Sequence, residues 1–112
     1  MKRADRIEGL LDDLRHTLVP AAELVDRGHT AFDGDVALRL AFEALSNRVG
    51  EVTKQLVHLD PDRLPEPEWS LASRHRDKVV HHYNSVNADR LWSTVTTEFP
   101  RLLVLAMSKE GL

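Results

Sequence analysis

The sequence predicts an all-α fold, an up-down four-helix bundle with kinked first and last helices, built as a single domain over residues 1–112. Three observations predict it. Apolar residues recur at steps of three and four, and no segment alternates with the period of two that is typical of a strand. Three polar or proline-rich connections separate four such segments. The length of 112 residues suits one compact core, and 42% hydrophobic with 29% charged residues is typical of a globular domain.

The first predicted helix covers about residues 3–27. Its apolar positions form one stripe, made of Ile7, Leu10, Leu11, Leu14, Leu18, Ala21 and Val25. Pro20 lies inside this stripe, and because an interior proline removes a backbone hydrogen bond and crowds the preceding turn, we expect a kink or a break near Leu18 and Val19. Gly28 ends the helix, and residues 28–34 are predicted to be a connection.

The second predicted helix covers about residues 35–58 and has the most regular apolar pattern. Its main stripe consists of Leu38, Ala41, Phe42, Leu45, Val49, Val52 and Leu56. A second, weaker apolar line on the opposite side consists of Ala37, Leu40 and Ala44. A helix that is apolar on two faces lies at the centre of its domain or packs against a second chain.

The remaining segments are a joint, a third helix and a last helix. Residues 59–68 carry three prolines and cannot form a regular helix. Helical character resumes from Trp69 to about Tyr83, and a polar turn follows at 84–87. The last helix is predicted over about residues 88–109, with Asn87 as its N-cap and a bend at Pro100.

The third predicted helix has an arginine where a core residue is expected. With about 100° of rotation per residue, four of its apolar residues form a stripe within about 40° on either side of Arg76. These residues are Trp69, Ala72, Val80 and Tyr83. An arginine at the centre of an apolar stripe is costly unless it is paired or lies in a hydrated cleft. The opposite arc forms a basic face that consists of Arg74, His75, Lys78 and His82.

Asp77 and His81 lie four residues apart on one line of this helix, about 100° to 140° from Arg76. A carboxylate at that spacing can accept a hydrogen bond from the imidazole and fix its tautomer. With Tyr83, the segment combines a permanent cation, a carboxylate, a group that titrates near neutral pH and a phenol. This set is a candidate active site.

Ordinary structural roles are the alternative for each of these residues. Arg76 could form an internal salt bridge, and His81 could serve only the dipole at the helix C-terminus. Tyr83 could belong to the core or its rim. Taken singly, none of the three residues indicates catalysis.

The segment Arg76-Asp-Lys-Val-Val-His81-His-Tyr83 resembles the R-x4-H-x-Y signature of HepT-like toxins in the HEPN superfamily. The resemblance extends beyond this motif. Trp69 stands seven residues before the arginine, and Gly50-Glu51 resembles a frequent Gly-Glu pair of the family. Residues 86–92 and 98–102 are similar to the family's last helix, including a tryptophan and a kinking proline.

The resemblance implies a ribonuclease toxin that acts as a homodimer, with two copies of the motif facing one cleft. It implies catalytic roles for Arg76, His81 and Asp77, and a minimal nucleotidyltransferase antitoxin that transfers AMP to Tyr83. One position departs from the family pattern, because Asp77 stands where asparagine is usual. An aspartate would favour protonated His81 but would repel a phosphate, which puts the catalytic rate in doubt.

RNA cleavage needs no cofactor or metal, because the ribose 2′-OH is the nucleophile. The net charge is −3, so RNA would have to meet a local basic rim, for which we expect Arg74, Lys78 and His75. A non-catalytic helical partner that regulates a nucleotidyltransferase is the alternative function. Metal binding by the six histidines is disfavoured, because His81 and His82 point to different sides and no acidic cluster completes a site.

The cellular setting follows from two absences in the sequence. There is no cysteine, which excludes disulfides and favours a reducing cytoplasm. No apolar run approaches the roughly 20 residues that a membrane span needs, and no helix combines an apolar face with a strongly basic one. We therefore expect a cytoplasmic protein without a membrane partner.

Overall fold

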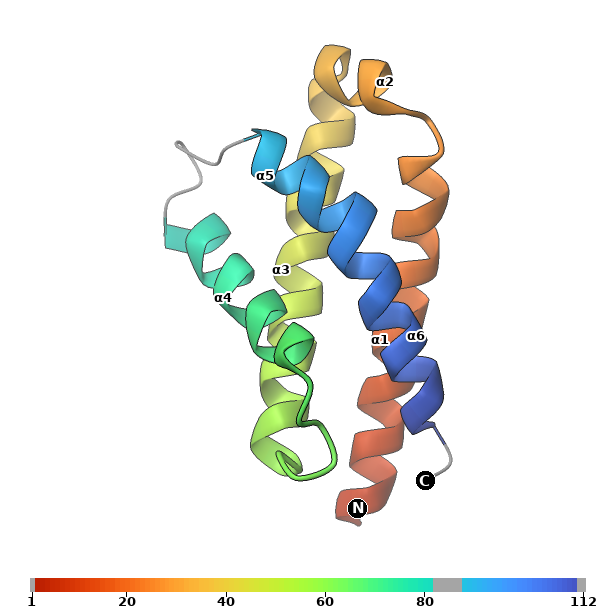
Figure 1. Ribbon diagram of the computed structural model, residues 1–112, viewed down its shortest axis with the longest axis vertical. Coiled ribbons are helices and arrows are strands. Elements are labelled where there is room, and N and C mark those ends of the chain that lie inside the picture. The colour runs from red at the N-terminus through yellow and green to blue at the C-terminus, as the bar shows by residue number, and fades with distance from the viewer. Residues whose placement is uncertain (1, 82–87, 111–112) are drawn as a thin grey trace.

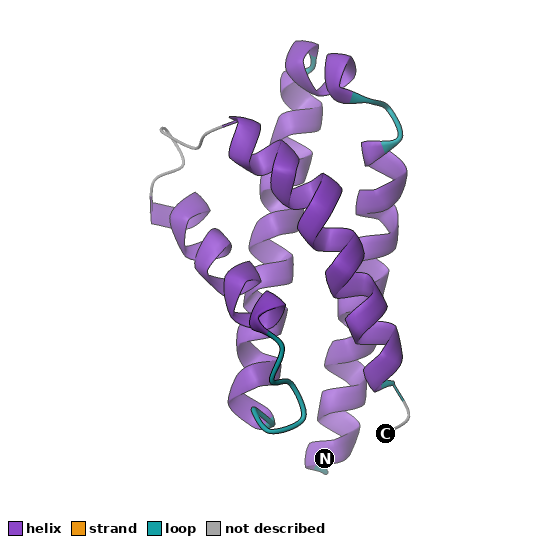
Figure 2. Cartoon of the chain, viewed as in Figure 1, coloured by secondary structure: helices purple, strands orange, loops and turns teal. Residues whose placement is uncertain are grey.

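The computed structural model describes residues 2–81 and 88–110, with the backbone alone for 75–81 (Figure 1). This part of the chain is mostly helical and contains no strand, which confirms the predicted all-α bundle. Its long elements are α1 (Arg3–Val25), α3 (Val36–Leu59), α4 (Pro67–His81) and a C-terminal helix. Figure 2 shows these helices side by side, with short loops between those that follow one another within the described ranges.

Helix α1 buries the predicted stripe and is not broken at Pro20. Ile7, Leu11, Leu14, Leu18 and Ala21 are buried in the core. The helix continues for 23 residues with Pro20 inside it. Pro20 is exposed, as is His16 one turn earlier, so water can reach the carbonyl group that loses its intrahelical donor. Of the predicted kink or break, the break is absent, because apolar packing on both sides of the proline holds the helix together.

The segment predicted as a connection contains a short helix, α2 (His29–Gly34). Gly28 precedes it with a φ of 90°, a conformation that glycine adopts without strain. Phe32 is fully buried, with its ring centroid 5.1 Å from that of Trp92 and 5.8 Å from that of Phe42. These contacts come from residues distant in sequence, which is why local turn signals did not indicate a helix.

Helix α3 begins where the sequence predicts. The Asp35 side chain caps it by accepting hydrogen bonds from the backbone N–H groups of Ala37 (3.0 Å) and Leu38 (3.3 Å). The main stripe is buried or half-buried. The second apolar line is exposed, with Leu40 58% exposed and Val36 beside it 66% exposed. Within the described part of one chain, α3 therefore leaves one apolar face in solvent.

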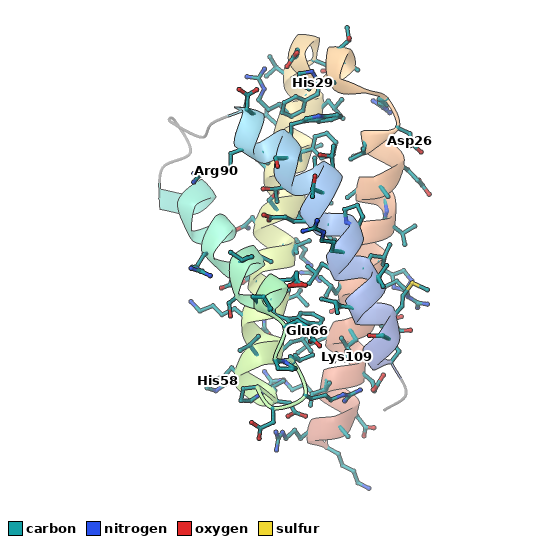
Figure 3. All side chains as sticks on the ribbon, viewed as in Figure 1. Asp26, His29, His58, Glu66, Arg90 and Lys109 are labelled. Atoms are coloured by element: carbon teal, nitrogen blue, oxygen red, sulfur yellow. The ribbon has the colours of Figure 1, made fainter. Side chains whose placement is uncertain are left out.

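The three-proline joint is held to both ends of the chain by polar contacts. Arg63 donates a hydrogen bond to Glu8 of α1 (3.1 Å) and another to the backbone carbonyl of Lys109. Glu66 accepts from Lys109 Nζ (3.0 Å), and Figure 3 shows the Glu66 and Lys109 side chains together at this end of the bundle. The joint thereby fixes where α4 starts relative to α1 and the C-terminal helix.

The C-terminal helix consists of three consecutive segments: α5 (Ala88–Ser93), the π-helical turn η2 (Thr94–Glu98) and α6 (Phe99–Lys109). The N–H of Phe99 bonds to the carbonyl of Thr94, five residues earlier. This wider turn directly precedes Pro100, whose ring would crowd the carbonyl four residues before it in a regular α-helix. The irregularity expected at Pro100 is thus a π-helical turn.

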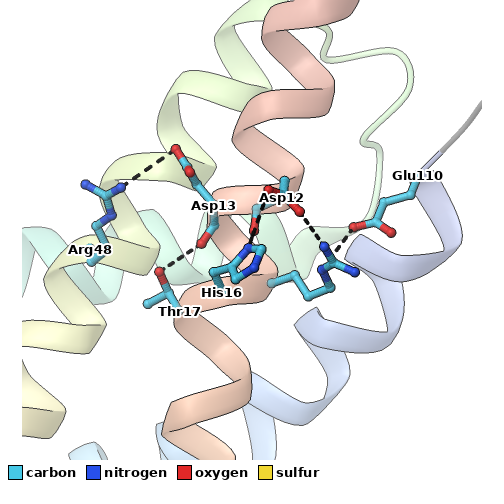
Figure 4. A network of polar contacts seen from close by, with 7 residues as sticks. Asp12, Asp13, His16, Thr17, Arg48 and Glu110 are labelled. Atoms are coloured by element: carbon cyan, nitrogen blue, oxygen red, sulfur yellow. Dashed lines mark hydrogen bonds and ion pairs between the residues drawn. The ribbon is translucent and has the colours of Figure 1, made fainter.

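Surface ion pairs tie the outer side of α1 to its neighbours. Asp13 pairs with Arg48 of α3 (3.7 Å), and Arg15 pairs with Glu110 just after α6 (3.7 Å; Figure 4). Arg15 also pairs with Asp12, and the His16 ring lies 3.4 Å from the same carboxylate. Such exposed pairs contribute little each to stability, so the buried stripes hold the bundle together.

Candidate active site on α4

The first turns of α4 pack against the rest of the bundle. Pro67 is its first residue, a position that needs no N–H donor. Trp69 is fully buried and Ala72 is 7% exposed, and α4 packs mainly against α3. The indole N–H of Trp69 donates to Glu66 (2.9 Å), which satisfies its one polar atom. The N-terminal half of α4 is therefore fixed in position. The candidate motif lies on the last turns of the same helix.

The backbone of α4 is α-helical through His81. Residues 77 and 81 therefore lie one turn apart, as the proposed Asp77–His81 pair requires. The side chains of Arg76, Asp77 and His81 lie outside the described residues, as do those of His75 and Lys78. Tyr83, the 84–87 turn and the Asn87 cap lie wholly outside them. The roles of the motif residues stay predictions.

Arg74 is the one predicted site residue whose side chain is described, and it is exposed. It lines a shallow pocket of about 230 Å³ between α3 and α4, with five other residues. These are Lys54 and Val57 of α3 and Trp69, Ser70 and Ser73 of α4. No local pattern in the sequence marks Lys54, Ser70 or Ser73. Only the register between α3 and α4 brings them together, and that register depends on the joint.

Among the described residues, no group of three histidines, cysteines or acidic residues lies close enough together to hold a metal ion. The described helices are also too short or too polar to cross a membrane. The described part of α4 carries four polar side chains, those of Glu68, Ser70, Ser73 and Arg74.

A helical bundle whose third long helix carries R-x4-H defines a HEPN-like domain. The chain belongs to the HepT-like ribonuclease family: the family model described as "Ribonuclease HepT-like" matches residues 14–108. This match covers all the helices from the second half of α1 to the last turn of α6, including the candidate motif.

Individual relatives carry consistent names. The chain is 29% identical over 93 residues to a putative RNase of Caldanaerobacter subterraneus subsp. tengcongensis, covering 80% of this chain and 83% of the relative. It is 40% identical over 55 residues to a probable ribonuclease HepT of Thermococcus cleftensis, and 33% identical over 52 residues to a putative RNase of Methanocaldococcus jannaschii. The last two matches cover 48% and 46% of this chain, and 49% and 43% of those relatives. No solved structure matches the chain significantly.

Proposed function

We propose that this chain is a metal-independent endoribonuclease toxin of a toxin–antitoxin system. The observation that carries the proposal is the R-x4-H motif, which lies on a continuous α-helix in a member of the HepT-like ribonuclease family. In this proposal His81 and Arg76 act on the RNA, and Asp77 orients the imidazole of His81.

The reaction follows from the chemistry of RNA. The ribose 2′-oxygen attacks the adjacent phosphorus while the bond from phosphorus to the 5′-oxygen breaks. One His81 takes the 2′ proton, and a second His81 gives a proton to the leaving 5′-oxygen. Arg76 stabilises the charge that builds on the phosphate oxygens through its planar set of donors. The products are a 2′,3′-cyclic phosphate and a 5′-hydroxyl end.

The second His81 comes from a second copy of the chain, so the proposed active form is a homodimer. Two features favour this assembly. Helix α3 leaves Val36, Ala37, Leu40 and Ala44 exposed, an apolar face that a partner could cover. Arg76 falls on the apolar stripe of α4 by its sequence position. The first half of that stripe, Trp69 and Ala72, is buried within the chain, and in this proposal its last turns border a cleft between two copies.

Cleavage assays on the purified chain test the catalytic assignment. His81→Ala should reduce RNA cleavage by about 100- to 10,000-fold, and Arg76→Ala should have a comparable effect, because each removes a group that acts in the transition state. His82→Ala, one residue away on the basic face, is the matched control and should retain activity. Chelators should not change the rate, and end-group analysis should find the cyclic phosphate.

The same assay separates the two candidate functions. Full activity of His81→Ala would refute the catalytic role of His81. A wild-type chain that cleaves no RNA but binds a nucleotidyltransferase would favour the alternative, a non-catalytic helical partner.

We also propose that a minimal nucleotidyltransferase antitoxin silences the toxin by adenylylating Tyr83. The phenol oxygen would attack the α-phosphorus of ATP and release pyrophosphate, leaving AMP on the tyrosine. The added bulk and negative charge near Arg76 and His81 in sequence would oppose the binding of RNA. Intact mass after co-expression should show one or more AMP increments that are absent from Tyr83→Phe. An increment that persists in Tyr83→Phe would overturn this assignment.

A further inference from the structure

The pocket between α3 and α4 has a chemical character of its own. Its rim carries two cations, Lys54 and Arg74, and two hydroxyl groups, those of Ser70 and Ser73. None of its six lining residues is acidic. Cations together with hydroxyl donors form the set of groups that binds phosphate oxygens in proteins.

The two rim cations are available for a ligand. Neither Lys54 nor Arg74 forms an ion pair with any residue that the structure describes. Elsewhere in the described ranges several cations do pair with acidic groups: Arg3 with Asp60, Arg15 with Glu110, Arg48 with Asp13, Arg63 with Glu8 and Lys109 with Glu66. In a chain whose net charge is −3, a cation on each wall of one pocket makes a local positive site when neither pairs with a described residue.

The inner wall of the pocket does not suit a nucleobase. Trp69 is fully buried, so its indole ring offers no face on which a base could stack. Its only donor, the indole N–H, is already bonded to Glu66 at 2.9 Å. The contacts that remain for a ligand come from the charged and hydroxyl groups, which points to the sugar–phosphate backbone.

The pocket lies on the same helix as the proposed catalytic residue His81. Helix α4 continues from Arg74 to His81, which lies seven residues or about 10 Å further along the axis. Seven residues are close to two full turns, so positions 74 and 81 fall on the same side of the helix axis. An RNA strand that follows this side of α4 would meet the pocket two turns before His81.

We propose that Lys54, Arg74, Ser70 and Ser73 bind a backbone phosphate of the RNA strand that flanks the scissile phosphate. The inference rests on the proposed ribonuclease function and extends it to a substrate-positioning site shared by α3 and α4. Binding here is independent of base identity, because every nucleotide presents the same phosphate.

Binding measurements in a His81→Ala background test this site without cleavage. Lys54→Gln and Arg74→Gln should each weaken binding of a fluorescent RNA oligonucleotide by about tenfold at low salt. Each should also reduce the slope of log affinity against log salt by about 1. The loss should be the same for oligouridine and oligoadenosine. Ser70→Ala with Ser73→Ala should weaken binding less and leave the salt slope unchanged, because no charge is removed.

Arg27→Gln is the matched control, since Arg27 is also exposed but lies just after α1, away from the pocket. It should leave the affinity and the salt slope close to those of the parent. Parent-like binding by both Lys54→Gln and Arg74→Gln would overturn the pocket while leaving the ribonuclease proposal intact. A wild-type chain that neither binds nor cleaves RNA would overturn both.

Discussion

Glu66 is a single residue that joins three parts of the chain. It lies in the joint, accepts a hydrogen bond from Trp69 on α4 (2.9 Å) and pairs with Lys109 at the end of α6 (3.0 Å). The hydrogen bond from Trp69 is the main reason that the pKa of the Glu66 carboxyl is lowered, and Lys109 adds to it, while partial burial opposes it. The ionised carboxylate therefore stabilises the folded chain.

This lowered pKa predicts a pH-dependent effect of Glu66→Gln. The folded-state pKa lies below the ordinary value of 4.5, so the stabilisation is present above that value and is lost as the pH falls through the folded-state pKa. The substitution should lower the free energy of unfolding by about 1 kcal/mol at pH 7, because an amide replaces a charged acceptor. Urea unfolding at pH 7 and at pH 3 measures the difference, which should shrink at pH 3. A difference that does not change with pH would contradict the role of the charge.

Single residues also show why parts of the candidate site could be predicted. Arg76 is distinguished by its position in an apolar stripe, and Asp77 and His81 are distinguished by a spacing that fits one helical turn. These are local properties of one segment. Lys54 gave no such signal, since an exposed lysine on a helix is ordinary until the fold places it beside Ser73 and Arg74.

A helix whose apolar stripe repeats within its own segment can be predicted from the sequence, whereas a helix that depends on contacts with distant residues cannot. The stripes of α1 and α3 repeat within each helix, so their periodicity predicts both elements and their buried faces. The six residues of α2 are too few to form a helix by themselves in water. Their helix depends on Phe32 packing against Phe42 and Trp92, which come from α3 and α5.

Phe32→Ala therefore tests whether tertiary packing maintains α2. Removing a fully buried phenylalanine should lower the free energy of unfolding by about 3–5 kcal/mol. Amide hydrogen exchange should show faster exchange at residues 29–34 first, while the amides in the middle of α3 remain the most protected. Ala31→Gly, a substitution at a half-buried neighbour, is the control and should cost about 1 kcal/mol. Unchanged exchange at residues 29–34 in Phe32→Ala would show that α2 does not depend on this side chain.

The alignment of the helices with one another is a property of the whole molecule, because no single segment specifies it. Arg63 holds the joint next to α1 and α6 through hydrogen bonds to Glu8 and to the backbone carbonyl of Lys109. This placement sets the register of α4 against α3. The register in turn creates the pocket that Lys54 and Arg74 line. Sequence periodicity predicts the four long helices, but side-chain contacts between distant segments decide how they align.

The exposed face of α3 provides a test of the proposed homodimer at this scale. Leu40 is 58% exposed, so Leu40→Glu should cost the isolated bundle little, within about 0.5 kcal/mol. If a second copy covers this face, the new carboxylate would be buried without a partner, and the dimer should dissociate into monomers with loss of RNA cleavage. Light scattering after size-exclusion chromatography measures the mass. Val104→Glu on α6, where Val104 is 68% exposed, is the matched control and should remain dimeric and active. A Leu40→Glu protein that stays dimeric would place the interface on another surface, whereas a monomeric wild type that cleaves RNA would remove the need for a second His81.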